Sequence, residues 1–324
     1  MNRGKNAYLG LNCFTSKDHI LKIDNDRRYF RLMQFGVFFI FLGRAWQHWF
    51  YEAPYRELLW DQGRMEWIIH KFLGLTWTEW VTNPQYDAGI TSFINGMGIF
   101  YLLCALSVLG VKKYPKITSP FIITGGISLI FLAGLYFKQK LYTPGEFIEY
   151  TLQFSSPFIL WHLVKSGGLT PRLVMALKIA VALTFVGHGL YAVNYYPRPA
   201  NFLVMCMNIL PINEDQAANF LSVVGTLDFI SVLLIFLPFR KAVLVGLIYA
   251  SIWGVATALA RPWAYFYWIY WEDSLHRWLF EAAFRLIHGL GPFVLLLYYW
   301  KGNPAGKSID TIHPGTDEIS HPKL

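Results

Sequence analysis

The sequence predicts an all-α integral membrane protein, a polytopic bundle of about eight transmembrane helices arranged as two parallel four-helix repeats. Of its 324 residues, 55% are hydrophobic and only 15% are charged, which is more apolar than is usual for a soluble domain. The apolar residues form long blocks, and the hydrocarbon core of a bilayer requires about 20 such residues per helix. The third observation is a likeness between the two halves of the chain.

Eight apolar blocks are expected to cross the membrane. They cover residues 31–51, 88–110, 118–137, 146–164, 173–195, 217–238, 242–260 and 278–300. Several contain Gly, Pro or a polar residue, which membrane helices tolerate where neighbouring helices cover the exposed backbone groups. The expected domains are an N-terminal arm (1–30), a first membrane repeat (31–165) with an amphipathic outer loop at 52–87, a second repeat (172–300) and a C-terminal tail (301–324).

Basic residues in the short loops predict the orientation. Lys112, Lys113, Lys165, Arg240 and Lys241 fall on the same side as the basic N-terminal arm, and the positive-inside rule assigns that side to the cytoplasm. We therefore expect a multi-pass protein of the bacterial cytoplasmic membrane with both termini cytoplasmic. This topology, together with anionic lipid head groups, explains the net charge of +8, so the bilayer and not nucleic acid is the expected partner.

The two halves share short sequence patterns in the same order. The first spans contain "FLGRAWQHW" (41–49) and "FVGHGLYAV" (185–193), and the second spans contain "GMGIFYLL" (96–103) and "VVGTLDFI" (223–230). The fourth spans contain "EFIEYTLQFSSPF" (146–158) and "EAAFRLIHGLGPF" (281–293). Because each half has four spans, the two repeats have the same orientation in the membrane.

The second half resembles the DoxX-like membrane protein family. The resemblance rests on the motif 186–189, Val-Gly-His-Gly, and on Gly225 followed by Asp228 in the next span. This family is distantly similar to the membrane-domain group of the vitamin K-dependent carboxylases. The first half departs from the pattern, with Arg44 at the His position and Tyr101 where Asp228 falls. The resemblance implies a redox-associated membrane protein, since some members resemble a subunit of thiosulfate:quinone oxidoreductase, and a quinone is the cofactor that it suggests.

Ionisable residues inside the spans predict a polar pocket. A charge in the hydrocarbon core costs about 2.5–3.5 kcal/mol on insertion scales, and the direction of each span places these residues at a similar depth, in the outer half of the membrane or near its middle. The candidate catalytic residues are His188, Asp228, Glu281 and His288, and the candidate ligand-binding residues are Arg44, His48, Asn95, Glu146, Glu149 and Arg285. We expect Arg44 to pair with a carboxylate of another helix, for which the candidates are Glu146, Glu149 and Asp228. We expect Glu281 to pair with Arg285 within its own helix.

Structural alternatives remain for these features. Buried ion pairs and polar contacts also serve to fix the register of membrane helices. The aromatic segment 261–273 ("RPWAYFYWIYWED") is typical of an interfacial belt, or it lines an entrance for a flat ligand such as a quinone ring. The three cysteines, Cys13, Cys104 and Cys206, match no metal-site spacing, so no metal is predicted.

Three functions fit the sequence. The first is a redox-associated, quinone-linked membrane protein with a polar pocket in the outer half of the membrane. It would need a membrane redox partner, because no flavin, haem or iron–sulfur motif is recognisable. The second is a non-catalytic accessory or assembly subunit of a larger membrane complex, and the third is a small-molecule or lipid transporter. Whether the protein is an enzyme stays open on the sequence alone.

Overall fold

The computed structural model describes residues 12–300, with side chains from residue 27, and this range is helical without any strand. The elements are α1 (Asn12–Phe50), α2 (Arg56–Leu59), α3 (Gln62–Leu73), α4 (Trp77–Thr82), α5 (Pro84–Gly110), α6 (Pro115–Gln139), α7 (Pro144–Glu149), α8 (Thr151–Ser166), α9 (Pro171–Ala192), α10 (Ala200–Ile209), α11 (Glu214–Phe236), α12 (Arg240–Ala264), η1 (Trp268–Tyr270), α13 (Trp271–Arg285) and α14 (Ile287–Trp300). The tail (301–324) and residues 1–11 of the expected arm lie outside the described range, and α1 begins well before the predicted span at residue 31.

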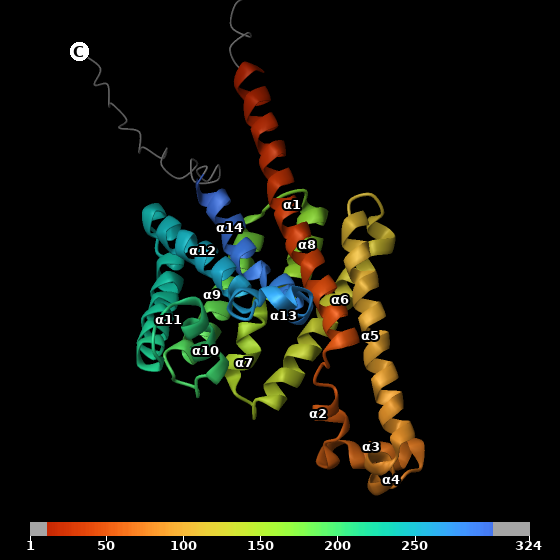
Figure 1. Ribbon diagram of the computed structural model, residues 1–324. Helices are drawn as coiled ribbons and strands as arrows, with labels where there is room; N and C mark the ends of the chain where they lie inside the picture. Colours follow the sequence, from red (N-terminus) through yellow and green to blue (C-terminus); the bar gives the residue numbers. More distant parts are fainter. Residues whose placement is uncertain (1–11, 301–324) are drawn as a thin grey trace, which may run out of the picture.

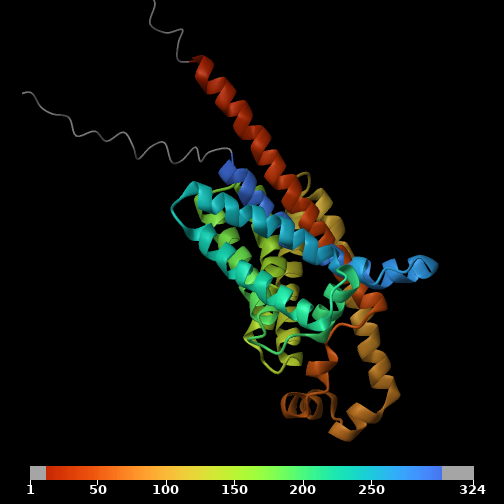
Figure 2. The same ribbon diagram turned by 60° about the vertical axis from the view of Figure 1, so that its left-hand side comes forward.

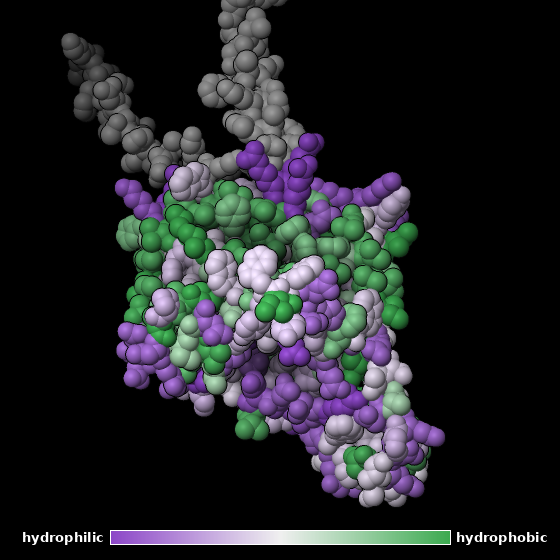
Figure 3. Space-filling view, in the orientation of Figure 1, coloured by the Kyte–Doolittle hydropathy of each residue, from purple (hydrophilic) through white to green (hydrophobic). Residues whose placement is uncertain are grey.

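Within the described range, six helical segments are long and apolar enough to cross a membrane. They are Pro84–Gly110, Pro115–Gln139, Pro171–Ala192, Glu214–Phe236, Arg240–Ala264 and Trp268–Trp300. On the face shown in Figure 3, hydrophobic residues cover the upper part and both sides of the bundle, and hydrophilic residues gather towards its two ends. The expectation of a multi-pass integral membrane protein is therefore confirmed, whereas the count of eight spans stays a prediction.

Helices α1 and α8 run through the bundle among these six segments. Helix α1 packs against α5, α8, α13 and α14, and α8 packs against α6 and α9 (Figure 1, Figure 2). Residues that face other helices need not be as apolar as residues that face lipid. This explains how α1 can carry Arg44, Gln47 and His48, all of them buried.

Proline and capping residues set many of the helix boundaries. Prolines begin α5, α6, α7 and α9, where their missing N–H has no partner to lose. Asn213 and Gln216 form a capping box at the start of α11. The observed bounds therefore lie close to most of the predicted spans. Helix α10 is the exception, because it lies in the connection at 196–216, where no helix was predicted.

Two of the predicted continuous spans are broken. The span at 146–164 divides into α7 and α8 at Tyr150, and the span at 278–300 divides into α13 and α14 at Leu286. At the first break, the backbone N–H of Leu152 donates to Thr184 Oγ1 of α9 at 3.0 Å. Membrane helices can be interrupted in this way where protein covers the freed backbone groups.

A glycine lets the first helix of each half approach the broken helix of the other half. A Cβ at Gly43 of α1 would lie 2.7 Å from the backbone oxygen of Phe280 and 3.1 Å from the backbone nitrogen of Phe284. A Cβ at Gly187 of α9 would lie 2.8 Å from the backbone nitrogen of Glu149. Because only glycine permits such close contact, these two crossings bring the helix breaks to the interface between the halves.

The two ends of the bundle differ in charge and structure. The upper end in Figure 1 carries the turns at 111–114 and 237–239, next to Lys112, Lys113, Arg240 and Lys241. The lower end carries α2, α3 and α4 in the first half and α10 in the second half (Figure 1). Ionisable residues in the lower part of the bundle form the candidate site.

Candidate functional site

Arg44 stands at the interface between the halves and is fully buried. Its Nη1 donates to Gln47 Oε1 and its Nη2 donates to Gln153 Oε1, both at 2.7 Å. The guanidinium also lies 3.9 Å above the ring of Phe284. Among the described residues it forms no ion pair, so the expected partnership with Glu146, Glu149 or Asp228 is wrong. Amide oxygens and aromatic faces stabilise the charge instead.

A series of polar side chains continues from Arg44 into the second half. The amide nitrogen of Gln153 lies 3.4 Å from His288 Nε2, and the rings of His288 and His188 have their centroids 5.0 Å apart. Glu149 then lies between His188 and Arg285, with one carboxylate oxygen 3.9 Å from His188 Nε2 and the other 3.9 Å from Arg285 Nη2. Side chains that are distant in sequence therefore form one cluster at the two helix breaks.

Arg261 completes this cluster, although the sequence interpretation did not single it out. Its Nη1 lies 2.7 Å from Glu281 Oε2, whereas Arg285 Nε lies 4.0 Å from the same oxygen. Glu281 is therefore bound chiefly by Arg261 of α12, and only loosely by its expected partner on its own helix. The available signal was an arginine directly after the apolar block 242–260, close enough to the hydrocarbon core for its charge to require a partner.

Three other predicted residues occupy different places. His48 Nδ1 contacts the Arg44 backbone oxygen at 2.6 Å and His48 Nε2 contacts Tyr55 Oη at 3.1 Å, so His48 is held within the first half. Glu146 is buried and accepts a hydrogen bond from Tyr191 Oη at 3.1 Å. Asn95 is exposed on α5, and its backbone oxygen accepts from the Trp49 indole. The expectation that Asn95 shares the pocket is wrong, because it faces away from the bundle.

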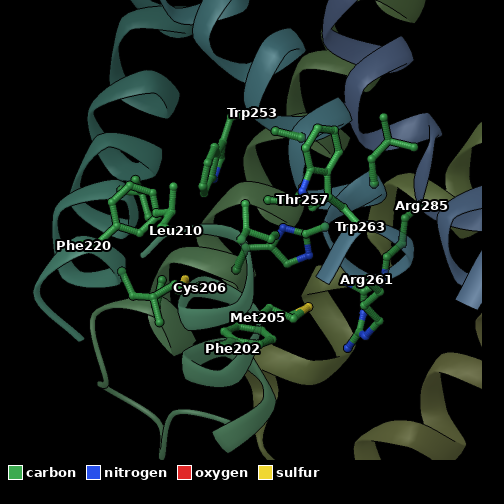
Figure 4. Close-up of a pocket in the computed structure, with 18 of the residues that line it drawn as sticks. Phe202, Met205, Cys206, Leu210, Phe220, Trp253, Thr257, Arg261, Trp263 and Arg285 are labelled. Carbon is green, nitrogen blue, oxygen red and sulfur yellow. The ribbon is translucent and has the colours of Figure 1, made fainter. Parts of the chain in front are cut away.

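A cavity of about 440 Å³ lies in the second half, between α9, α10, α11, α12 and α13 (Figure 4). Its polar lining residues are His188, Asp228, Thr257, Arg261 and Arg285. The rest of the wall is largely apolar and includes Phe202, Met205, Leu210, Phe220, Leu221 and Trp253. An apolar cavity of this size with a few convergent polar groups is the usual form of a small-molecule site.

Asp228 faces this cavity and has one local partner. Tyr249 Oη lies 3.0 Å from Asp228 Oδ1 and also 3.0 Å from the backbone oxygen of Val224. The sequence interpretation found no partner for Asp228, because Tyr249 comes from the following helix. A carboxyl group beside a phenol can exchange a proton or a hydrogen bond with a ligand in the cavity.

The polar wall has hydrogen-bond donors to spare. Within the described residues, His188 Nε2 and Arg285 Nε are buried and have no hydrogen-bond partner. The guanidiniums of Arg261 and Arg285 are balanced by the carboxylates of Glu281 and Glu149. The wall therefore suits a neutral ligand with oxygen acceptors better than a strongly charged one.

The comparisons with known proteins add no relatives. No family model, no curated protein and no solved structure matches the chain. The DoxX-like resemblance therefore rests on the sequence motifs described above.

Proposed function

We propose that this chain is a DoxX-like, redox-associated integral membrane protein whose second half binds a quinone. The observation that carries the proposal is the cavity of about 440 Å³ whose lining includes His188 and Arg285, each with a buried side-chain nitrogen that has no hydrogen-bond partner among the described residues. A quinone has a flat apolar ring with two carbonyl acceptors. Both features match a cavity with aromatic walls and free donors.

Each lining group has a role in this proposal. His188 and Arg285 would donate hydrogen bonds to ring oxygens, and Asp228, which also lines the cavity, would exchange protons together with Tyr249. Phe220 and Trp253, whose ring centroids are 6.2 Å apart, offer faces for the ring. A bound quinone would supply two-electron, two-proton chemistry, and a membrane redox partner would exchange the electrons.

The proposal includes eight spans, formed by adding α1 and the pair α7–α8 to the six apolar segments, arranged as two parallel repeats. Two contacts support the repeat, because they occur at positions that correspond when the sequences of the two halves are aligned. A Cβ at Gly98 would meet Trp49, and a Cβ at Gly225 would meet Val193, 144 residues after Trp49. The basic upper end would face the cytoplasm, so the cavity would lie in the outer half of the membrane.

A second candidate function is that of an accessory subunit, and one surface favours it. Segment 263–271 exposes large side chains, including Trp268 at 83% and Ile269 at 86%. Figure 2 shows that the η1 turn and the start of α13 project from the bundle. Such a segment either anchors the protein at the membrane interface or contacts a partner subunit. A partner that co-purifies in equal amount and is lost in Trp268→Ser would support this function.

Mass spectrometry of lipid extracts tests the quinone proposal. Wild type purified in mild detergent should retain quinone at about one molecule per chain, and His188→Gln and Asp228→Asn should each retain about tenfold less, because one good hydrogen bond to an ionisable group contributes roughly 1.4 kcal/mol. Asn95→Ala, an exposed change on α5, is the matched control and should behave as wild type. Well-folded wild type that carries no quinone and takes up none when it is added would overturn the proposal.

A further inference from the structure

The cavity has two chemically different sides. Figure 4 shows Arg261 and Arg285 on one side and Phe220 and Leu210 on the other. The side chains that α10 and the following residue contribute are Phe202, Met205, Cys206, Ile209 and Leu210, and none of them carries a charge. A compact head group held at the arginines would leave this side unfilled, and unfilled apolar space forfeits dispersion contacts. The shape therefore favours a ligand with an apolar extension.

Helices α11 and α12 enclose this apolar side as a wedge. They are in close contact at one end, where Ser231 Oγ donates to the backbone oxygen of Gly246 at 2.9 Å. Further along the two helices, Tyr249 of α12 bonds Asp228 of α11. Beyond this bond, the ring of Phe220 on α11 packs against the ring of Trp253 on α12. Beyond that level α10 packs against both helices, and Asn208 Nδ2 donates to the backbone oxygen of Ala264. Helix α10 therefore covers the wide end of the wedge.

The lining of the cavity includes residues that also face outward. Ala256 and Leu259 of α12 line the cavity and are exposed, Leu259 at 45%. Both lie on a helix that is apolar enough to cross the membrane. Lipid would therefore contact the same residues that line the cavity. At this place a single layer of side chains separates the cavity from the lipid.

We infer that the wedge between α11 and α12 is a lateral entrance for a membrane amphiphile with a ring-shaped head and one long apolar chain. The head passes Ala256 to reach His188, Arg261 and Arg285, while the chain lies beneath α10 and continues into the hydrocarbon. The identity of the head rests on the proposed quinone function. The entrance itself requires only the cavity, the wedge and the lipid-facing wall.

The thiol of Cys206 reports on access, because it lines the cavity and is half-buried. In lipid nanodiscs, Cys206 labelling is measured with the lipid-soluble reagent N-phenylmaleimide and with a charged maleimide added in water. Each rate is divided by the rate of the same reagent with a free thiol in solution, after subtraction of the labelling seen in Cys206→Ser. The lipid-soluble reagent should be at least about tenfold faster on this scale, because the charged reagent does not enter the hydrocarbon. Ala256→Phe should slow the lipid-soluble reagent by about tenfold, since the new ring narrows the wedge. Ile252→Phe is the matched control on the same helix, because Ile252 is 67% exposed and does not line the cavity.

Protection of Cys206 by quinones tests whether the ligand carries a long apolar chain. Decylubiquinone should protect the thiol at about tenfold lower membrane concentration than duroquinone, a fully substituted ring without a long chain. Equal protection by the two quinones would show that the cavity does not bind the apolar chain of the ligand, and this result would overturn the inference. Rapid labelling by the charged reagent would show an opening to water and would also overturn it. If Ala256→Phe blocks labelling but neither quinone protects, the quinone function fails and the lateral entrance stands.

Discussion

At the lower end of the bundle, the space between α5 and α6 of the first half and the space between α11 and α12 of the second half are filled very differently. In the first half, the region between α5 and α6 is filled by Tyr55, only 3% exposed, in one apolar cluster with Ala53, Ile90, Ile94 and Leu132. In the second half, the region between α11 and α12 is covered by α10 and contains the cavity of about 440 Å³ (Figure 4). The segment that follows the first helix of each half decides whether this space is filled or hollow. The first half does have a pocket of about 320 Å³, but it lies outside this space, beside Leu59, Trp80 and Tyr86.

The buried polar groups also differ between the two halves. Tyr101 Oη bonds Ser128 Oγ at 2.8 Å in the filled half, whereas Asp228 bonds Tyr249 at 3.0 Å beside the cavity. At the helix crossings, Arg44 lies over Phe284 in one case, and His188 lies near Glu149 in the other. The first crossing therefore holds a single buried cation against amide groups and an aromatic ring. The second crossing brings an ionisable pair together beside the cavity, which favours a function in the hollow half.

The largest expected effect comes from emptying the filled half. Tyr55→Ala should lower the free energy of unfolding by about 3–5 kcal/mol, because it creates a cavity and removes the partner of His48. Phe202→Ala beside the existing cavity should cost about 1 kcal/mol or less. Unfolding titrations in mixed detergent measure both values. Equal losses for the two variants would remove the distinction between a filled and a hollow half.

The ion pair at the polar wall should be the next largest contributor. Arg261→Gln should lower the free energy of unfolding by about 2–3 kcal/mol, because it leaves Glu281 largely buried without its closest partner. A double-mutant cycle with Glu281→Gln should give a coupling energy of about 1 kcal/mol or more. Additive losses in the same unfolding titrations would mean that this pair does not hold the wall together.

The glycines at the two crossings test how alike the halves are. Gly43→Ala and Gly187→Ala should each destabilise the protein by about 1–3 kcal/mol, since each added methyl meets the backbone of the opposite broken helix. Gly134→Ala on α6 is the control, because its methyl would meet nothing within 4 Å, and it should be neutral or stabilising by up to about 1 kcal/mol. Melting temperatures in detergent would show the difference, and tolerance at only one crossing would contradict the likeness.

The smallest effect concerns the connection that helps to close the first half. A hydrogen bond from Lys138 lowers the pKa of Asp61, which lies between α2 and α3. Because the folded pKa is depressed, this contact stabilises the fold above the ordinary aspartate pKa of about 3.9 and loses its contribution as pH falls through the depressed value. Hydrogen exchange across α3, corrected for intrinsic rates, should therefore rise between pH 6 and pH 3. Asp61→Asn should show the faster exchange already at pH 6, and an unchanged rate there would contradict the role of the contact.

The sequence alone was sufficient to predict most of the helices, but it was not sufficient to predict where helices are interrupted. Long apolar blocks and helix-starting prolines such as Pro84, Pro115 and Pro171 fix the position of a helix locally. The break at Tyr150 depends on Thr184 and Gly187 of another helix, which no local pattern reveals. Helix α10 was missed because its apolar run, between Pro199 and Pro211, is too short to cross a membrane.

The site was predictable in part for similar reasons. Span direction predicted that His188, Glu149, Arg285 and His288 line one polar pocket, and the structure does bring these four side chains together. Asn95 was misplaced because a helix that is apolar on all sides gives no signal of which face looks inward. The cavity could not be foreseen, since an empty volume depends on how side chains from five helices fill the space between them.

A density map of the protein in lipid nanodiscs with decylubiquinone, at a resolution that shows side chains, tests the central claim most directly. The proposal predicts a ring beside His188 and Arg285 with its chain beneath α10, and no ligand density next to Tyr55 in the first half. A cavity without quinone, or a quinone bound elsewhere on the bundle, would contradict the claim that the hollow half is the functional half.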